Sequence, residues 1–244
     1  MRSFLIALQF LTVLPIRIKQ QPDAEATGRS LLYYPLVGLM LGAFLAVPAW
    51  MLGDAAALVA AALLLSLWVA ATGALHLDGL ADSADAWIGG FGDRDRTLAI
   101  MKDPYCGPAA VTTLVLVLLI KFTALTQIIA NGNWAILLVV PVLGRSTLIL
   151  LFLTTPYVRA HGLGSLLADH LPRHACIAAV FFTVVTVLLI SGVAGFWLLL
   201  TTAGILFILR WLMQQRLGGT TGDTAGALVE ITEAAVLVTA ALVW

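Results

Sequence analysis

The sequence predicts an all-α membrane protein, a polytopic helical bundle with about seven transmembrane helices and a short N-terminal helix. Hydrophobic residues make up 61% of the 244 residues and charged residues only 11%, and the mean hydropathy is +1.03. Apolar runs long enough to cross about 30 Å of hydrocarbon recur along the chain. They lack the strict alternation of barrel strands, and a helix satisfies its own backbone hydrogen bonds in lipid. Helical spans are therefore expected.

Seven apolar ranges are the expected membrane-spanning helices: 31–52, 55–75, 108–130, 134–154, 175–190, 196–213 and 227–244. Residues 1–15 are apolar but short, and no small-residue cleavage site follows them. We therefore expect a retained interfacial or tilted helix there rather than a signal peptide, with an eighth span as the alternative. No long linker or fixed-period repeat divides the chain, so residues 1–244 are interpreted as one integral membrane domain.

Basic residues gather in alternate loops, which predicts the topology. The turns near 53, 132 and 193 contain no Lys or Arg, and Asp54 is the only carboxylate in any of them. The other loops hold the basic residues Arg17, Lys19, Arg29, Arg94, Arg96, Lys102, Arg159, Arg173, Arg210 and Arg216. By the positive-inside rule these loops face the cytoplasm and the C-terminus faces the other side. The expected location is the cytoplasmic (inner) membrane of a prokaryote, with the candidate site facing the cytoplasm.

Charge and cysteine content exclude other classes. The formal net charge is zero, so no excess basic field is available for nucleic acid, and no nucleic-acid-binding motif is present. Cys106 and Cys176 both fall near the expected cytoplasmic face, where thiols stay reduced. We expect neither a disulfide nor a cysteine metal site.

Three carboxylates, Asp78, Asp82 and Asp85, directly follow an apolar run. On a helix they fall within about 60° of arc, so they share one face. Ionised groups near bilayer depth cost roughly 2.5 to 3.5 kcal/mol each, so such a cluster suggests function. Carboxylates with no Cys and only His76 nearby are ligands typical of a hard cation such as Mg²⁺. In the alternative, one Asp caps a helix and the others are solvated.

The following loop adds candidates for the same site. Asp103 brings a fourth acid to the same membrane face, at the entrance of the next span. Arg94, Arg96 and Lys102 are candidates to hold phosphate oxygens, and the alternative is that they are loop charges that only set the topology. The glycines at 89, 90 and 92 do not form a nucleotide-binding fingerprint.

A second motif with glycines and an acid spans residues 217–227 and contains Gly222 and Asp223. Glu230 shares a helical face with Asp223, and Glu233 follows inside the last span. The small residues fit close helix packing equally well. The motif therefore predicts either part of the site or a helix contact.

Several other polar residues leave two interpretations open. Lys121 and Arg145 lie within spans and need partners or a water-filled cavity. The Arg145 guanidinium suits either a phosphate or a structural ion pair. His161, His170 and His174 fit no zinc motif and are expected in a solvated or substrate-facing loop.

Taken together, these motifs closely resemble the cobalamin synthase family, the adenosylcobinamide-GDP ribazoletransferases. The resemblance rests on residues 76–85, 100–107 and 218–227, and it extends to 10–15, 34–42 and Arg145. It therefore covers nearly the whole chain. Two departures are visible: Ala86 stands where members usually carry Gly, and residues 104–106 replace a more polar stretch.

A looser resemblance links the chain to the CDP-alcohol phosphotransferases. Asp82, Asp85 and Asp103 fit the first three acids of that family's motif, whereas the fourth position falls on Gly107 and the motif's Ala-Arg falls on residues 89–90. A general base must then come from elsewhere. The candidates are Asp78, His76, Asp223 and Glu230, among which the sequence does not choose.

The closer resemblance implies transfer of the adenosylcobinamide phosphoryl unit from its GDP-linked form to a ribose hydroxyl of α-ribazole or its 5′-phosphate. GMP is released, in a late step of cobalamin biosynthesis. Mg²⁺ on Asp82, Asp85 and Asp103 would neutralise the pyrophosphate, with Asp78 as a further ligand or a proton acceptor. Expected partners are these two small molecules and membrane lipid, with a homo-oligomer or association with other corrinoid enzymes left open.

Two alternatives from other classes remain at this point. A CDP-alcohol-type phospholipid phosphotransferase would use the same carboxylates. A cation-coupled transporter would also place acids in spans, but it should show them near the membrane midplane and within repeats.

Overall fold

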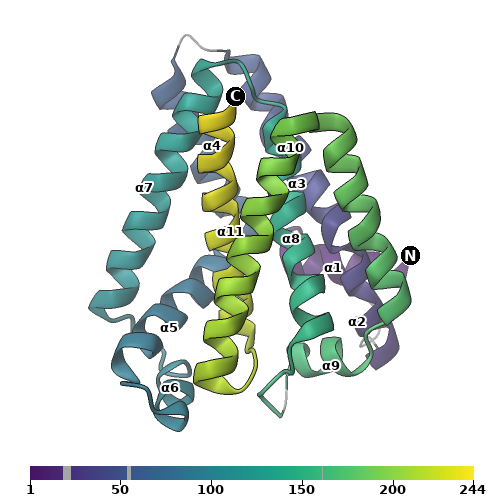
Figure 1. The fold of residues 1–244 in the computed structure, drawn as a ribbon, viewed down its shortest axis with the longest axis vertical. Coiled ribbons are helices and arrows are strands. Elements are labelled where there is room, and N and C mark those ends of the chain that lie inside the picture. The colour runs from purple at the N-terminus through teal and green to yellow at the C-terminus, as the bar shows by residue number, and fades with distance from the viewer. Residues whose placement is uncertain (19–22, 54–55, 161) are drawn as a thin grey trace.

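Helices form all of the regular structure in the part of the chain that is described. The computed structural model describes residues 1–18, 23–53, 56–160 and 162–244 (Figure 1), so Lys19, Asp54 and His161, placed in loops above, lie outside it. The elements in chain order are α1 (Arg2–Leu11), α2 (Ala24–Ser30), η1 (Leu31–Tyr33), α3 (Tyr34–Leu52), α4 (Ala57–Thr72), α5 (Leu75–Gly89), α6 (Arg94–Ile100), α7 (Pro108–Ala130), α8 (Ile136–Thr154), α9 (Leu163–Asp169), α10 (Arg173–Leu217) and α11 (Gly222–Val243). The predicted all-α class is confirmed.

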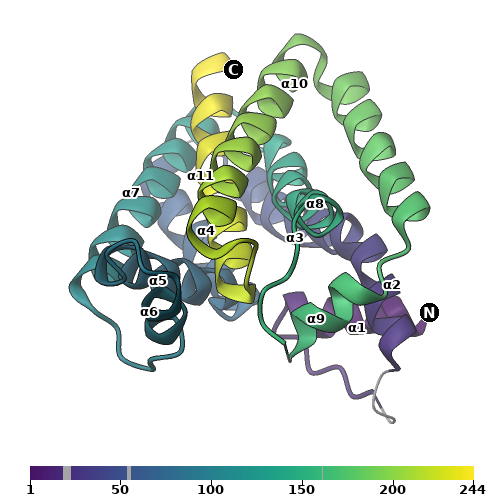
Figure 2. The same ribbon diagram turned by 60° about the horizontal axis from the view of Figure 1, so that its bottom comes forward.

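The predicted spans fall on helices. Among the described residues, five helices are long and apolar enough to cross a membrane, or six if α4 and α5 together make one span. Helix α10 accounts for two predicted spans, because Gly192, with φ 53° and ψ −131°, breaks it. The chain turns back at this point, so α10 has two limbs that diverge from the turn (Figure 2). The last predicted span differs at its start, since α11 begins at Gly222 rather than at residue 227.

The loops that carry the basic residues lie at one end of the bundle. Figure 1 shows α5, α6 and α9 at the bottom, whereas the C-terminus and the turn within α10 lie at the top. We call the bottom the charged end. This arrangement agrees with the alternation of loops predicted from the sequence.

A sharp bend places α5 across the charged end. The axes of α4 and α5 differ by 88°. Gly73 and Ala74 separate the two helices, and both adopt left-handed backbone conformations, with φ of 61° and 57°. The N–H of Gly73 still donates to the carbonyl of Ala70, which closes the last turn of α4. The acid-bearing α5 therefore leaves the direction of α4.

Glycines allow the closest approaches between helices. A Cβ added to Gly38 or Gly42 of α3 would lie 2.5 Å from a backbone oxygen of α8. A Cβ on Gly79 of α5 would lie 2.7 Å from the backbone oxygen of Asp223 in α11. On the other side of that crossing, Gly226 faces the backbone of His76. The packing role considered for the glycines of the second motif therefore applies to Gly226.

Helix α1 is a short surface-packed element rather than a span. It has ten residues, too few to cross the hydrocarbon, and it lies transverse to the long helices (Figure 1). Three of its four buried residues, Ala7, Leu8 and Leu11, join a core cluster with Leu31 and Tyr34. This agrees with the expected short N-terminal helix and not with an eighth span.

Candidate active site

Helix α5 carries the first acidic motif on one face at the charged end. The helix is continuous over Asp78, Asp82 and Asp85, so their carboxylates share a side as expected. Asp78 is exposed and the other two are half-buried. The charge of Asp82 is repelled by Asp78, Asp85 and Asp223 and attracted by Arg159. The two sequence motifs therefore meet at Asp82.

The surroundings of Asp85 differ from those of Asp78 and Asp82. Its carboxylate accepts hydrogen bonds from the backbone N–H groups of Gly107, at 2.5 Å, and Ala110, at 2.9 Å. Gly107 is the N-cap of α7, so Asp85 satisfies the otherwise unpaired N–H groups of that helix from a neighbouring one. One acid of the motif thus has the helix-capping role that was the alternative to metal binding.

Gly107 also explains a departure from the CDP-alcohol phosphotransferase motif. A Cβ at this position would lie 2.7 Å from Oδ1 of Asp85, closer than real Cβ contacts allow. An acid at the fourth position of that motif would therefore displace Asp85 from α7. The cap formed by Asp85 therefore requires a glycine at position 107.

Asp103 is exposed, and its hydrogen bond is to its own loop rather than to α5. Its Oδ1 accepts a hydrogen bond of 3.1 Å from the N–H of Tyr105 in the same loop. In the described ranges, no group of three or more His, Cys, Asp or Glu side chains could hold a metal ion. The structure therefore does not gather Asp82, Asp85 and Asp103 as ligands of one ion, because Asp85 and Asp103 are turned toward backbone N–H donors.

The second motif begins α11 and holds Asp223 beside an arginine from a distant loop. Nη2 of Arg159 lies 2.5 Å from Oδ2 of Asp223. The two loops are joined by backbone hydrogen bonds: Val158 donates to Thr220 and Thr220 donates to Pro156, each at 2.9 Å. Thr221 and Thr224 form a capping box that starts α11. The local sequence thus fixes the position of Asp223 on the first turn.

A cavity of about 340 Å³ opens beside these residues. Four residues expected in the site line it: His76, Asp78, Gly222 and Asp223. The other lining residues include Phe10, Tyr34, Leu148, Phe152, Tyr157 and Arg159. A second cavity of about 540 Å³ shares Phe152, Tyr157 and Arg159 with the first and continues toward Asp169 and Arg173. Both acids and arginines therefore line this space.

Three polar side chains line this space and are able to hydrogen-bond a bound molecule. Burial, partly offset by Arg159, raises the pKa of the Tyr157 phenol, which therefore stays protonated as a hydrogen-bond donor. Nδ1 of His76 and Nε of Arg159 are buried and have no hydrogen-bond partner in the described part of the chain. A bound molecule would satisfy such groups, because buried polar atoms are nearly always paired.

The other cations predicted to bind phosphate lie around α6 and do not line the cavity. Nε of Arg94 donates to the carbonyl of Leu217 at 2.8 Å, and Arg96 stacks over the ring of Phe91 at 5.1 Å. Lys102 is exposed in the loop that follows. The Arg94 contact joins α6 to the end of α10, and the phosphate-binding role of the three cations stays a prediction.

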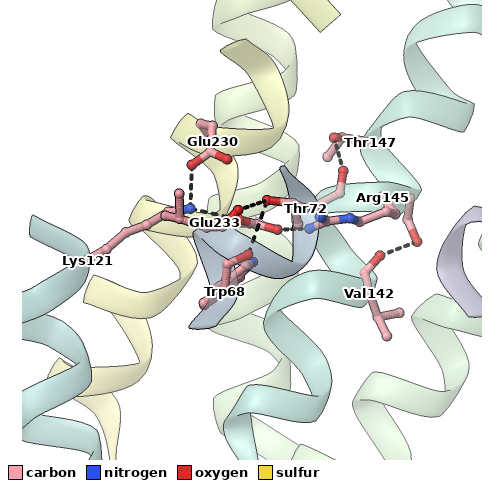
Figure 3. Close-up of polar contacts among 11 residues, drawn as sticks. Trp68, Thr72, Lys121, Val142, Arg145, Thr147, Glu230 and Glu233 are labelled. Carbon is pink, nitrogen blue, oxygen red and sulfur yellow. Dashed lines mark hydrogen bonds and ion pairs between the residues drawn. The ribbon is translucent and has the colours of Figure 1, made fainter. Parts of the chain in front are cut away.

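Glu230 and Arg145 belong to a buried ionic network inside the bundle (Figure 3). Lys121 Nζ lies 2.5 Å from Glu230 and 2.8 Å from Glu233, and Glu233 also pairs with Arg145. The ammonium of Lys121 lies 4.7 Å from the centre of the Trp68 ring. The expectation that Lys121 and Arg145 need partners is confirmed.

Glu230 and Arg145 have structural partners in this network instead of the catalytic and phosphate-binding roles expected as candidates. The carboxylate of Glu230 is paired with Lys121, two turns beyond Asp223, rather than placed at the cavity as a general base. Arg145 is 1% exposed and forms the structural ion pair that was the alternative to phosphate binding. Four buried charges, two of each sign, explain this arrangement, since a charge in lipid needs a partner.

Arg159 and Tyr157 were not singled out from the sequence as site residues. They occupy the loop after α8, more than sixty residues before Asp223, and no periodic pattern links the two segments. The only sequence signal was that Arg159 shares the charged end with the acids. Pairing between Tyr157 and Thr220, which brings Arg159 to the site, is a tertiary contact.

Comparisons with known proteins identify the family of the chain. The profile of the family described as cobalamin-5-phosphate synthase matches residues 3–241. The adenosylcobinamide-GDP ribazoletransferase of Pseudomonas fluorescens is 57% identical over 99% of this chain and 100% of the relative. The proteins of the same name from Stutzerimonas stutzeri and Pseudomonas aeruginosa are 58% and 56% identical, each over 99% of this chain and 98% of the relative. No solved structure matches. The chain therefore belongs to the cobalamin-5-phosphate synthase family.

Proposed function

We propose that this protein is an adenosylcobinamide-GDP ribazoletransferase whose reaction takes place in the cavity at the charged end. Relatives that are 54–58% identical over 99% of this chain carry that name. The observation that supports the location best is the meeting of the two motifs, where Asp78, Asp82 and Asp223 face Arg159. Carboxylates and an arginine around one cavity suit a nucleotide-linked substrate and the groups that act on it.

In the proposed reaction, a ribose hydroxyl oxygen of α-ribazole or its 5′-phosphate forms a bond to the phosphorus that carries adenosylcobinamide. The bond between this phosphorus and the bridging oxygen of GDP breaks, and GMP leaves with that oxygen. The hydroxyl proton passes to a protein group. Catalysis of this kind depends on positioning and on stabilising negative charge.

Mg²⁺ is the cofactor that we propose, held mainly by Asp78 and Asp82. These carboxylates lie one turn apart, and no hydrogen-bond donor among the described residues engages either of them. Mg²⁺ is usually held by one or two carboxylates together with substrate phosphates, so three protein ligands are not required beforehand. Bound there, the ion would neutralise the pyrophosphate. Asp85 and Asp103 would add to this set only by giving up their backbone N–H donors.

Residues of the cavity have distinct proposed roles. Arg159 would contact a phosphate through its unpaired Nε while Asp223 holds its other side. Tyr157, protonated and adjacent, would donate to the same phosphate. Asp78, the exposed carboxylate on the cavity wall, is a metal ligand in this proposal, which leaves the free Nδ1 of His76 as our choice for the proton acceptor. By accepting a hydrogen bond there, His76 would also orient the entering hydroxyl.

The membrane orientation follows from the charged end. We propose that this end faces the cytoplasm of a bacterial inner membrane, because Arg17, Arg29, Arg96, Lys102, Arg173 and Arg216 are all in its loops or at its helix ends. Both substrates would then reach the cavity from the side where nucleotides are made.

The proposal is tested by incubating the purified protein with adenosylcobinamide-GDP and α-ribazole 5′-phosphate, with Mg²⁺ or with EDTA. We expect GMP and the joined cobalamin phosphate in equal amounts, and neither product with EDTA. Asp82→Ala should lose turnover, whereas Glu25→Gln, which removes an exposed acid at the same end of the bundle, should not. Full turnover in EDTA would contradict the metal assignment alone. Product from CDP-diacylglycerol in place of the corrinoid would contradict the proposed substrate.

A further inference from the structure

We propose that a crevice between α8 and the two limbs of α10 binds an anionic phospholipid, with an acyl chain along the crevice and the phosphate at Arg210. The crevice has a volume of about 560 Å³; it shares no lining residue with the cavity that holds His76, Asp78 and Asp223, and it adjoins the second polar cavity at Thr154. It exists because the limbs of α10 diverge from the turn at Gly192, with α8 between them (Figure 2).

The length and position of the crevice fit one leaflet. Its lining on α8 runs from Leu143, near the middle of the helix, to Thr154, the last residue, at the charged end. At 1.5 Å per residue this is about 16 Å. The hydrocarbon of one leaflet is about half of 30 Å thick. An acyl chain that enters at the charged end would therefore extend to the middle of the bilayer.

The wall of the crevice is chemically apolar although five hydroxyl residues line it. Each of these hydroxyls donates to a carbonyl three or four residues earlier in its own helix, at 2.6–3.0 Å; the residues are Ser146, Thr147, Thr154, Thr183 and Thr202. The wall therefore offers no free hydroxyl donor to fix a polar substrate. It also contains no carboxylate, and the other lining residues apart from Arg210 are apolar. Such a wall suits hydrocarbon.

A positive group stands where the phosphate of such a lipid would lie. Nη2 of Arg210 donates to the carbonyl of Thr154 at 2.7 Å, and Nη2 of Arg173 donates to that of Leu153 at 3.0 Å. The two arginines therefore flank the C-terminal end of α8. Neither forms an ion pair with a carboxylate anywhere in the described ranges.

The remaining donors of these two guanidiniums are available to an anion at the membrane surface. A phosphodiester headgroup is the anion present at that depth, and basic pockets between helices bind such headgroups. Arg210 would make the direct contact because it lines the crevice, whereas Arg173 lines the neighbouring polar cavity.

Native mass spectrometry of the purified protein tests the proposal with phosphatidylglycerol and phosphatidylcholine as probes. The wild type should retain phosphatidylglycerol in preference to phosphatidylcholine. Arg210→Gln should reduce that preference about tenfold. Arg210→Lys, which keeps the positive charge, should retain part of the wild-type preference. Ala203→Phe, which fills the crevice, should reduce retention of both lipids. Matched controls are Arg29→Gln, at an exposed arginine, and Ala62→Phe, at an exposed alanine of α4; both should behave as the wild type.

Several results would overturn the proposal. Equal retention of the two lipids by the wild type would do so, as would an Arg210→Gln or Ala203→Phe variant that keeps the wild-type pattern. Glycerol phosphate that displaced phosphatidylglycerol at equal concentration would show a headgroup site without an acyl chain. A lipid-free dimer would show that a second copy fills the crevice. Because lipid retention is measured without substrates, none of these results depends on the proposed activity.

Discussion

Asp82 and Asp85 lie one turn apart on α5, but the carboxylates around Asp82 repel its charge and the groups around Asp85 stabilise that of Asp85. Asp82 is repelled by three neighbouring carboxylates, whereas Asp85 accepts two hydrogen bonds from the start of α7. An unpaired charge among like charges destabilises the fold and is available for a ligand. A carboxylate that caps a helix stabilises the fold.

Matched substitutions should separate these two roles. Asp85→Ala should lower the free energy of unfolding by about 1–2 kcal/mol, the usual cost of losing a helix cap. Asp82→Ala should leave the melting temperature unchanged or slightly raised, because it relieves repulsion, while turnover falls roughly 10- to 100-fold or more. Melting curves in detergent without Mg²⁺, together with initial rates with Mg²⁺, measure both effects. A loss of stability for Asp82→Ala as large as that for Asp85→Ala would contradict the division.

The buried network leads to a prediction about charge balance. Lys121→Met leaves the side chains of Glu230 and Glu233 with one positive partner, Arg145, between them. Breaking a buried pair by removing one partner costs about 3–5 kcal/mol. Adding Glu230→Gln restores a neutral set, so the double variant should be more stable than Lys121→Met alone. Unfolding in mixed micelles measures the difference, and an additive loss in the double variant would argue against a shared charge network.

At the scale of helices, composition and length were sufficient for the spans, because lipid demands apolar helices wherever the chain crosses it. The two short helices α6 and α9 carry no comparable signal, since seven residues hold only two turns. The bend between α4 and α5 was also not predicted. Gly73 signals the end of α4, but the left-handed conformation of Ala74, which sets the new direction of α5, has no counterpart in the local sequence.

In the candidate site too, some features could be predicted from the sequence and others could not. The three acids of α5 and Asp223 were found from the sequence, because carboxylates beside apolar runs need a reason to be there. Capping of a helix by one of these acids was an alternative, but neither the capping of α7 by Asp85 nor the contact formed by Arg159 was predicted, because each joins segments that are distant in sequence. Their position depends on packing that a single sequence does not encode in any local pattern.

The crossing of α5 and α11 should tolerate no added side-chain atom. A Cβ at Gly79 would lie 2.7 Å from the backbone of Asp223, so Gly79→Ala should push the helices apart and separate the two motifs. We expect lower turnover and a lower melting temperature. Gly204→Ala is the matched control, since no atom lies within 4 Å of its Cβ position. It should be neutral or stabilise α10 by up to about 1 kcal/mol through helix propensity. Equal behaviour of the two variants would contradict close packing at Gly79.

For the whole molecule, the two cysteines offer a direct measurement of orientation. Cys106 is exposed at the charged end, and Cys176 is buried at the start of α10. A maleimide that cannot cross membranes should label Cys106 in inside-out vesicles and not in intact spheroplasts. Cys176 should react only after denaturation, and Cys106→Ser should abolish the native signal. Labelling of Cys106 in spheroplasts would reverse the proposed orientation.

The bend after α4 also relates the site to the thickness of the bilayer. Helix α4 has 16 residues, which is about 24 Å, so without α5 it is shorter than the roughly 30 Å of hydrocarbon in a bilayer. A short span thins the lipid around it or draws its flanking residues inward. Because α5 turns aside directly afterwards, we expect His76 and Asp78 in its first turn to lie at the hydrocarbon border. We therefore expect hydrophobic mismatch to set the depth of the cavity in the bilayer, and turnover compared in shorter-chain and longer-chain bilayers measures this effect.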